Sequence, residues 1–358
     1  MSGGVDSSVA LFLLKKQGFE VIGATVKFNC WQDEKNAIKE NVCCSECSME
    51  RAKKTCEKFG VPYFIIDASE QFQKTVIDYF LETLKNNQTP SPCLFCNRSV
   101  KIKALLDFAK EENADYVATG HYARTIENDG EFQLQSPKDK EKDQTYFLAL
   151  LSQEQVSKIV FPLRDLTKQE AYRIAEEQGI KHTLRQSQDL CFIGEKSLTD
   201  FLTENIGVKS GKILDTKGVL LGEHKGLHFY TKGQRKGINL AGGPFWVVDF
   251  DIEKNNLIVS KDKNDKRFFS KELWLSGVSF ISDRLPKGKT KILTRTRFRQ
   301  PLVKATLIRR SQDSGNSTDW RLIFDAPQQS VAPGQIAVFY SLPDGGTCLG
   351  GGIIELTK

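Results

Sequence analysis

The chain begins with a loop rich in glycine and serine, Ser2-Gly3-Gly4-Val5-Asp6-Ser7-Ser8, which runs directly into an apolar segment, Val9–Leu14. Two glycines let the backbone approach an anion closely, so that successive N–H groups point at it. The N-terminus of the helix that follows adds partial positive charge and free donors. A glycine turn with a Ser or Asp N-cap is the alternative, but one short turn rarely needs so many special residues. The pattern predicts a phosphate-binding loop.

This string resembles, letter for letter, the signature of the PP-loop ATP pyrophosphatases. It differs from a Walker A loop because it has no Gly-Lys-Ser/Thr ending. The resemblance implies that the loop binds ATP, releases pyrophosphate and leaves AMP on an oxygen of another molecule. In that family an apolar strand precedes the loop, whereas only Met1 precedes it here. We therefore expect about eight further apolar residues ahead of Met1, at ~3.3 Å per residue of strand.

The bulk composition is that of a globular protein with more than one domain. A length of 358 residues favours two or three domains, and 39% hydrophobic with 27% charged residues is typical of soluble chains. No apolar run approaches the ~18 residues of a membrane span, and no signal segment opens the chain. We expect a cytoplasmic protein with no membrane partner.

The order of strand and helix patterns predicts the architecture. Residues 1–199 alternate between the two, which predicts βαβ units and a parallel sheet. Residues 200–268 read as a small mixed α/β linker domain, and the short strands of 269–358 predict a C-terminal β-barrel or sandwich. The expected elements are strands at 20–28, 62–68, 115–119, 245–251, 256–260, 291–299, 302–308, 320–324, 335–340 and 348–354, and helices at 48–59, 71–84, 99–110 and 168–178.

A basic segment lies in the third region. The net charge of +6 is mild, but Lys291 to Arg310 contains seven Lys or Arg and no acidic residue, alternating with apolar positions. This predicts a strand with one cationic face that can neutralise phosphates. A solvated strand face is the alternative. The stretch Gln135–Gln144 reads as a charged loop.

Nine cysteines make thiol or metal chemistry a candidate, since an odd number in a long cytosolic chain argues against a disulfide framework. Cys93 and Cys96 form a CxxC after Pro92, in a loop before the predicted basic helix, where cations and a helix N-terminus favour the thiolate. Burial as small hydrophobic residues is the alternative. The group Cys43, Cys44 and Cys47 suggests a further metal site, with zinc as the candidate and no clear fourth ligand.

Over its whole length the chain resembles the tRNA-specific 2-thiouridylases, which belong to the PP-loop superfamily with its adenine nucleotide α-hydrolase-like fold. The matching stretches, in order, are residues 119–124 (TGHYAR), 142–148 (KDQTYFL), 161–163 (FPL), 226–227 (GL), 230–237 (YTKGQRKG) and 333–335 (PGQ).

The resemblance implies a function and a set of site residues. ATP would adenylate the C2 oxygen of the wobble uridine, and sulfur would then displace AMP to give 2-thiouridine. Cys96 matches the family's nucleophile and Cys191 its persulfide carrier. The nucleotide contacts match Ser2, Gly3, Gly4, Val5, Asp6, Ser7, Ser8, Val26 and Gly120. The tRNA contacts match Ser91, Pro92, Cys93, His121, Lys142, Asp143, Gln144, Arg297, Phe298 and Gln335.

Cys93 departs from the family pattern, in which an aspartate more often follows Asn-Pro. With Cys93, Cys96 and Cys191 the chain has three thiols that could hold a [4Fe–4S] cluster with one open iron. The alternative needs only Cys96 and Cys191: a persulfide on Cys191 attacks, and Cys96 resolves it as a disulfide. Both schemes remain open at this point.

The expected partners follow from the same resemblance. They are ATP with Mg²⁺, for which Asp6 is a candidate ligand, a persulfide donor protein, and tRNAs accepting lysine, glutamate or glutamine. Phe298 would stack in the anticodon arm. Asp143 and Gln144 look like a base-reading pair, whereas His121 reads as a structural hydrogen bonder. A PP-loop amidating ligase and an RNA-binding module with a degenerate ATP site are the competing functions.

Overall fold

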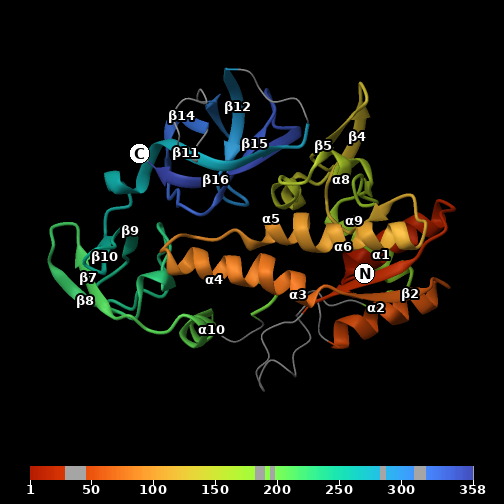
Figure 1. Ribbon diagram of the computed structural model, residues 1–358, viewed down its shortest axis with the longest axis horizontal. Coiled ribbons are helices and arrows are strands. Elements are labelled where there is room, and N and C mark those ends of the chain that lie inside the picture. The colour runs from red at the N-terminus through yellow and green to blue at the C-terminus, as the bar shows by residue number, and fades with distance from the viewer. Residues whose placement is uncertain (29–45, 182–189, 194–197, 283–287, 310–319, 358) are drawn as a thin grey trace.

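The computed structural model describes the chain except residues 29–45, 182–189, 194–197, 283–287, 310–319 and 358. It has three parts: an α/β part that contains the N-terminus, a small sheet, and a barrel (Figure 1). This order is the predicted one. No helix in the described part of the chain is both long enough and apolar enough to cross a membrane.

The α/β part is built on parallel strand pairs. Helix α1 (Val5–Lys16) follows the opening loop. β1 (Gly23–Lys27) pairs in parallel with β2 (Tyr63–Asp67), and β3 (Val117–Ala118) pairs in parallel with β6 (Ile159–Val160). Helix α2, Glu46–Lys58, comes between β1 and β2. Parallel pairing confirms the predicted α/β class, although β1, β2 and β3 are shorter than predicted and β6 has no counterpart among the predicted strands.

The helix that carries the CxxC begins earlier than predicted. It runs as α5 (Pro92–Cys96), a π-helical turn η2 (Asn97–Lys101) and α6 (Ile102–Glu111). The placement of Cys93 and Cys96 in a loop was wrong, because Pro92 starts the helix at its first position, where a missing N–H costs nothing. The preceding helical stretch is α3 (Ser69–Phe72), η1 (Gln73–Ile77) and α4 (Asp78–Lys85).

The rest of the α/β part includes elements that the sequence did not reveal. A hairpin of β4 (Arg124–Asn128) and β5 (Glu131–Gln135) is followed by the stretch predicted as a charged loop, which contains one capped 3-10 turn, η3 (Lys140–Lys142). The short helices α7 (Thr145–Leu148) and α8 (Gln153–Ser157) follow. Helix α9 (Lys168–Glu177) then confirms the helix predicted at 168–178.

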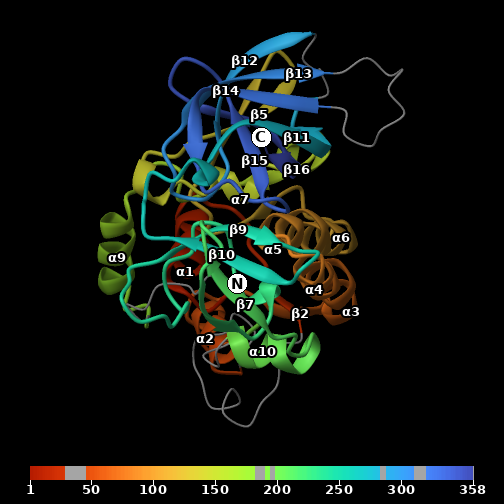
Figure 2. The same ribbon diagram turned by 90° about the vertical axis from the view of Figure 1, so that its left-hand side faces the viewer.

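The middle part is a four-stranded sheet with the strand order β8-β7-β10-β9, which faces the viewer in Figure 2. Helix α10 (Leu198–Asn205) leads into it. β7 and β10 pair in parallel and the other pairs are antiparallel. The strands are Gly211–Asp215, Leu220–His224, Trp246–Asp251 and Asn256–Ser260, with 3-10 turns at Leu227–Phe229 and Lys266–Phe268.

The third part is a closed barrel of six strands in the order β11-β14-β13-β12-β15-β16, closed by pairing of β11 with β16. Closure removes open sheet edges. The strands are Phe269–Phe280, Lys289–Arg295, Val303–Arg309, Trp320–Gln329, Ile336–Tyr340 and Thr347–Thr357. The barrel prediction is confirmed, but β12 ends at Arg295, so Arg297 and Phe298 lie in the turn after the predicted basic strand and not on it.

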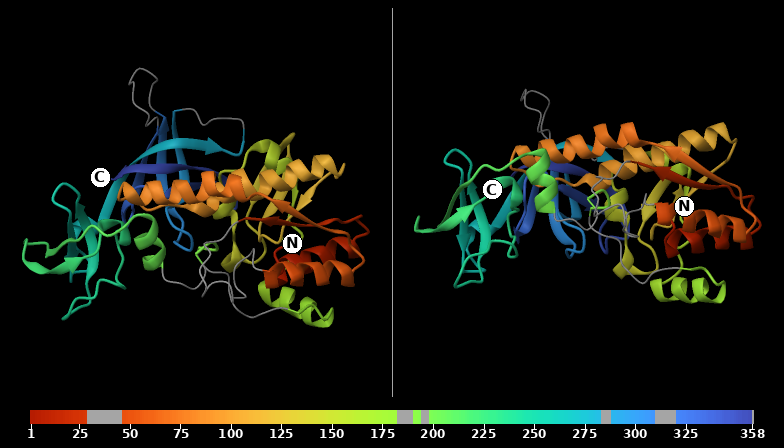
Figure 3. Two further views of the ribbon diagram at one scale, coloured as in Figure 1. Left: turned by 60° about the horizontal axis from the view of Figure 1, so that its bottom comes forward. Right: turned by 90° about the horizontal axis from the view of Figure 1, so that it is seen from below.

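The α/β part and the barrel share one hydrophobic core. Leu94 and Ile102, from the CxxC helix, belong to the same buried cluster as Ile336 and Val338 of β15. The β5 strand also pairs with β16, so the hairpin extends the barrel sheet. In both views of Figure 3 an orange helical stretch of the α/β part runs beside the blue strands of the barrel. Relative movement of the two parts would therefore break a packed interface.

Candidate active site

The opening loop is held by its own side chains. Ser7 and Ser8 donate their hydroxyls to the carbonyl of Gly4, at 3.1 and 3.0 Å, and the Ser2 and Ser7 hydroxyls lie 3.1 Å apart. Gly3 has φ +69°, and a Cβ there would lie 2.1 Å from the carbonyl oxygen of Ser48. Only glycine fits this position. The loop is thus fixed at the N-terminus of α1, whose first N–H groups have no partner within the helix.

Two of the predicted nucleotide contacts meet this loop or its surroundings. A Cβ on Gly120, just after β3, would lie 2.7 Å from the backbone nitrogen of Ser7. Val26, on β1, packs against the cluster that contains Cys96. Gly120 therefore abuts the loop, and Val26 abuts the hydrophobic cluster that contains Cys96.

Charged and polar side chains reach the loop from distant segments. Lys168, at the start of α9, places Nζ 2.6 Å from Oδ1 of Asp6. The Tyr122 hydroxyl donates to the same oxygen at 3.0 Å, and Arg51 Nε donates to the Gly3 carbonyl at 3.3 Å. Sequence reasoning missed Arg51 and Lys168. The capping box of Thr167 with Glu170 marks the start of α9 but cannot indicate what the helix start faces.

Cys96 and Cys191 share a hydrophobic environment although they are far apart in the sequence. Cys96 is buried in a cluster with Phe28, Phe72 and Phe192. Cys191 is half-buried and packs against the same cluster. The structure therefore brings the predicted nucleophile and the predicted persulfide carrier to one place.

Cys93 lies near a tyrosine that the sequence did not single out as a site residue. Tyr146 is buried, and burial raises the pKa of its hydroxyl well above the usual range, with a smaller increase from Cys93. Arg295 and Arg297 act in the opposite direction and lower this pKa. The Tyr146 hydroxyl lies 3.2 Å from the carbonyl oxygen of Ile336 and donates to the backbone of the barrel. The Tyr146 hydroxyl therefore stays protonated. Its hydrogen bond to Ile336 links the region around Cys93 to the barrel.

The structure does not support a metal site on the three thiols. Among the described residues, which include Cys93, Cys96 and Cys191, no group of three or more His, Cys, Asp or Glu side chains is placed to hold a metal ion. The three thiols are not grouped as metal ligands in this arrangement, and a [4Fe–4S] cluster stays a prediction. Of the other metal candidate, Cys43 and Cys44 lie outside the described residues, and Cys47 is exposed.

All three parts of the molecule meet at the segment that precedes the CxxC. Thr89 donates its backbone N–H to the Pro333 carbonyl of the barrel at 2.8 Å, and its hydroxyl lies 3.4 Å from that of Thr231 in the middle part. A Cβ on Gly334 would lie 2.9 Å from the Thr89 carbonyl oxygen. Ser91, a predicted tRNA contact, is therefore presented by a junction of three domains.

The other predicted tRNA contacts from the barrel lie beside this junction. Arg297 Nε donates to the side chain of Gln335 at 3.0 Å, and its Nη2 donates to the Lys232 carbonyl at 2.8 Å. The Phe298 ring packs on Phe147, with ring centroids 4.4 Å apart. The structure thus brings Arg297, Phe298 and Gln335 together, but each already has partners within the protein.

His121 is a neutral hydrogen bonder in this structure. Its Nδ1 lies 2.9 Å from the Thr119 hydroxyl. Burial, and to a smaller degree the charge of Lys101, lowers the pKa of the His121 imidazole to about 3. The interpretation of His121 as a structural residue agrees with this geometry.

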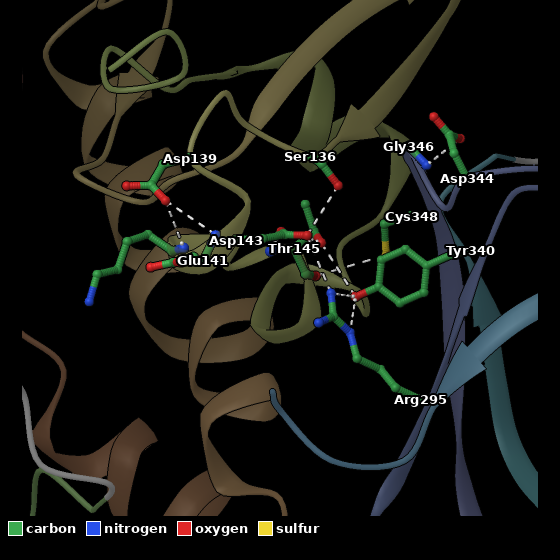
Figure 4. Close-up of polar contacts among 11 residues, drawn as sticks. Ser136, Asp139, Glu141, Asp143, Thr145, Arg295, Tyr340, Asp344, Gly346 and Cys348 are labelled. Atoms are coloured by element: carbon green, nitrogen blue, oxygen red, sulfur yellow. Dashed lines mark hydrogen bonds and ion pairs between the residues drawn. The ribbon is translucent and has the colours of Figure 1, made fainter. Parts of the chain in front are cut away.

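Asp143 is enclosed at the junction with the barrel (Figure 4). Its Oδ1 accepts from the backbone and hydroxyl of Thr145, at 2.9 and 2.7 Å, and its Oδ2 accepts from Ser136 at 3.1 Å and Arg295 at 3.3 Å. Gln144 accepts from the Tyr122 N–H at 2.9 Å. In this state Asp143 is not free to read a base as half of a pair with Gln144. Contact between tRNA and this segment stays a prediction.

Comparison with known families follows the same division into three parts. Residues 1–195 match the tRNA methyl transferase HUP domain, residues 199–261 the tRNA methyl transferase PRC-barrel domain, and residues 270–354 the aminomethyltransferase beta-barrel domain. These descriptions refer to methyl transfer, whereas the similar curated proteins described next are thiouridylases.

The chain is 40% identical to the tRNA-specific 2-thiouridylase MnmA of Lactobacillus johnsonii, over 99% of this chain and 94% of that protein. It is 39% identical to the MnmA of Pseudoalteromonas translucida, over 99% and 96%. A solved structure, the U34-tRNA thiolase NcsA from Methanococcus maripaludis with its [4Fe–4S] cluster, shares 24% identity over 57% of this chain and 64% of its own, with a TM-score of 0.33. That likeness is too weak to bear on the present site.

Proposed function

The chain belongs to the tRNA-specific 2-thiouridylase family, and we propose from this premise which of its residues perform each half of the reaction. Its similarity to these enzymes extends over 99% of its length. It is accordingly an ATP-using enzyme that places sulfur at the 2-position of a uridine in tRNA. The reaction has an activation half, which needs ATP, and a sulfur half, which needs thiols.

In the activation half, the loop from Ser2 to Ser8 holds the phosphates of ATP at the N-terminus of α1. Gly120 abuts Ser7, and together with Val26 it borders the nucleotide. The C2 oxygen of the wobble uridine attacks the α-phosphorus, and pyrophosphate leaves. Transfer of AMP makes that oxygen a good leaving group. Mg²⁺ would bind together with the phosphates of ATP, as it usually does in proteins. Asp6 is the candidate carboxylate ligand in the loop.

In the sulfur half, Cys191 carries a persulfide whose terminal sulfur attacks C2 and displaces AMP. Cys96 then attacks the Sγ of Cys191. The bond between this Sγ and the sulfur on C2 breaks, and its electrons stay with that sulfur to give 2-thiouridine. A disulfide then joins Cys96 to Cys191. A thiol reductant must restore both cysteines. The observation that carries this scheme is the shared cluster of Cys96 and Cys191.

The tRNA would bind where three domains contact one another, at the segment before Cys93. Residues 1–199, 200–268 and 269–358 are the proposed domains, and the contacts of Thr89 with Pro333 and Thr231 join them. Ser91 and Pro92 would touch the target base, with Lys142, Arg297, Phe298 and Gln335 around it. The base must leave its stack to reach Cys191. We expect a persulfide donor protein, tRNAs for lysine, glutamate and glutamine, and a cytoplasmic location.

The test is thiolation of a tRNA transcript by the purified protein with ATP and a low-molecular-weight persulfide, followed by mass spectrometry of the nucleosides. Cys96→Ser and Cys191→Ser should each abolish 2-thiouridine. Cys348→Ser, at another buried cysteine, and Cys47→Ser, at an exposed one, are the matched controls. Undiminished product in either active-site variant would refute the assignment.

Cys93 separates the persulfide scheme from the cluster scheme. Cys93→Asp restores the residue that the family more often has at this place. The variant should keep its activity if Cys96 and Cys191 suffice, and lose it if Cys93 is a ligand of iron. Anaerobic purification followed by iron and sulfide analysis gives a second result. One cluster per chain, required for activity, would overturn the persulfide scheme.

A further inference from the structure

The phosphate-binding loop has no cation of its own. From Met1 to Leu14 the sequence contains neither Lys nor Arg, and the basic residues Lys15 and Lys16 stand in the last turn of α1, away from the loop. It does contain a carboxylate, Asp6. A bare carboxylate near a triphosphate is electrostatically unfavourable, so the loop needs positive charge from elsewhere.

Lys168 supplies a cation at this place. Its Nζ lies 2.6 Å from Oδ1 of Asp6, across 162 residues of sequence. The Tyr172 ring centroid lies 4.7 Å from the ammonium and the Tyr122 ring centroid 5.9 Å, so two aromatic rings lie beside this cation. An ammonium has three donors, and the bond to Asp6 uses one of them.

The position of Lys168 is not explained by the stability of its own helix. It is the first residue of α9, after the N-cap Thr167. The N-terminus of a helix carries partial positive charge and favours acidic side chains. A lysine at this position therefore opposes the helix dipole, and its contact with Asp6 is the compensating interaction.

We propose that Lys168 is a positioning residue for the adenylation step, which holds Asp6 and cancels its charge so that the loop can receive the phosphates of ATP. This inference rests on the proposed function of the loop. It adds a residue from α9 to a site whose sequence motif ends at Ser8. Without Lys168, the Asp6 carboxylate keeps the hydrogen bond from Tyr122 but has no cation beside it when it faces an anionic substrate.

The experiment compares Lys168→Met with Lys168→Arg in steady-state thiolation. The KM for ATP should rise about tenfold to a hundredfold in the Met variant, the range expected when a charge-assisted contact is lost. It should stay within a few fold in the Arg variant, which keeps the charge. The KM for tRNA should not change in either. Lys138→Met is the matched control, because Lys138 pairs with Glu170 of the same helix at 3.1 Å but on the exposed surface.

An unchanged KM for ATP in the Met variant would overturn the proposal. So would an equal loss in the Met and Arg variants, or a rise in the KM for tRNA that matches the rise for ATP, since either result indicates general damage to the fold. If the Met variant does not fold, Lys168→Gln takes its place. Binding of a non-hydrolysable ATP analogue, measured by equilibrium dialysis, tests Lys168 even if the wild-type protein shows no thiolation, so the two hypotheses can fail separately.

Discussion

Two ion pairs join distant segments of this protein, and they are built from the same parts. Asp6 pairs with Lys168 across 162 residues, and Asp143 pairs with Arg295 across 152. Each pair includes a tyrosine hydroxyl: Tyr122 donates to Asp6, and the Tyr340 hydroxyl accepts from Arg295. Each cation also lies over the ring of its tyrosine.

The two pairs differ in their access to solvent. The side chains of Lys168 and Asp6 are 15% and 35% exposed, whereas those of Arg295 and Asp143 are 11% and 10% exposed. A carboxylate that remains accessible can respond to a ligand. A pair withdrawn from water on both sides has no such freedom, and removing one partner leaves an uncompensated buried charge. We infer that the first pair serves substrate binding and the second holds the barrel to the α/β part.

The largest expected effect tests the buried pair. Arg295→Met leaves Asp143 without its cation and should lower the free energy of unfolding by about 3–5 kcal/mol, the usual cost of breaking such a pair. The measurement is urea unfolding followed by tryptophan fluorescence.

Arg309→Met is the control for Arg295→Met, since Arg309 is an exposed cation on the neighbouring strand β13, over the ring of Trp320. It should change stability by less than about 0.5 kcal/mol. A loss below about 1 kcal/mol for Arg295→Met would mean that the buried pair contributes no more than a surface pair.

The second largest effect should come from the tyrosine of the buried pair, Tyr340. Tyr340→Phe removes an acceptor that Arg295 uses through Nε at 3.1 Å and Nη2 at 2.9 Å. Leaving buried donors unsatisfied costs about 1–3 kcal/mol, and we expect a loss of stability in that range with an unchanged KM for ATP. A rise in that KM without loss of stability would contradict the structural role assigned to this pair.

The pH dependence of stability should separate the two regions. Because the pKa of His121 is about 3 in the folded protein, against about 6.5 when unfolded, the unfolded chain takes up a proton that the folded chain refuses. The contribution is complete above pH 6.5 and is lost as the pH falls from 6.5 towards 3. By pH 5.5 the loss of stability amounts to about 1.4 kcal/mol.

Urea unfolding at pH 7.5 and pH 5.5 measures this term as the difference between the wild type and His121→Gln. Residues 269–358 contain no histidine, so the buried pair should not contribute over this range. A variant that keeps the full pH dependence would exclude His121 as its source. Burial also lowers the pKa of His224 and of His228 in the middle part, and they should contribute to the remainder.

The smallest effect concerns the tyrosine of the loop pair. Tyr122→Phe removes one hydrogen bond to Asp6 but leaves Lys168 in place, so the KM for ATP should rise about threefold to tenfold, the equivalent of one ordinary hydrogen bond. Stability should change little. If Tyr122→Phe raises the KM for ATP as much as Lys168→Met does, the charge of Lys168 is not the decisive feature.

Much of the fold was predictable because it depends on local patterns. The loop at Ser2 to Ser8 and the sequence of α/β, mixed and barrel regions follow from motifs and from periodicity. The errors have local causes as well. The predicted loop at Pro92 is a helix start in the structure, because proline favours the first position of a helix. The hairpin β4–β5 was missed because strand patterns are weak where a strand is stabilised by its neighbour, here β16.

The site divides in the same way. Residue chemistry predicts the phosphate loop and the CxxC, and the family resemblance adds Cys191, because these signals lie in short stretches of sequence. The meeting of Cys96 with Cys191, the approach of Lys168 to Asp6, and the burial of Asp143 against Arg295 are contacts across long separations. Spacing along the chain carries no information on such contacts. They depend on which segments pack together, and packing also sets the exposure that distinguishes the two ion pairs.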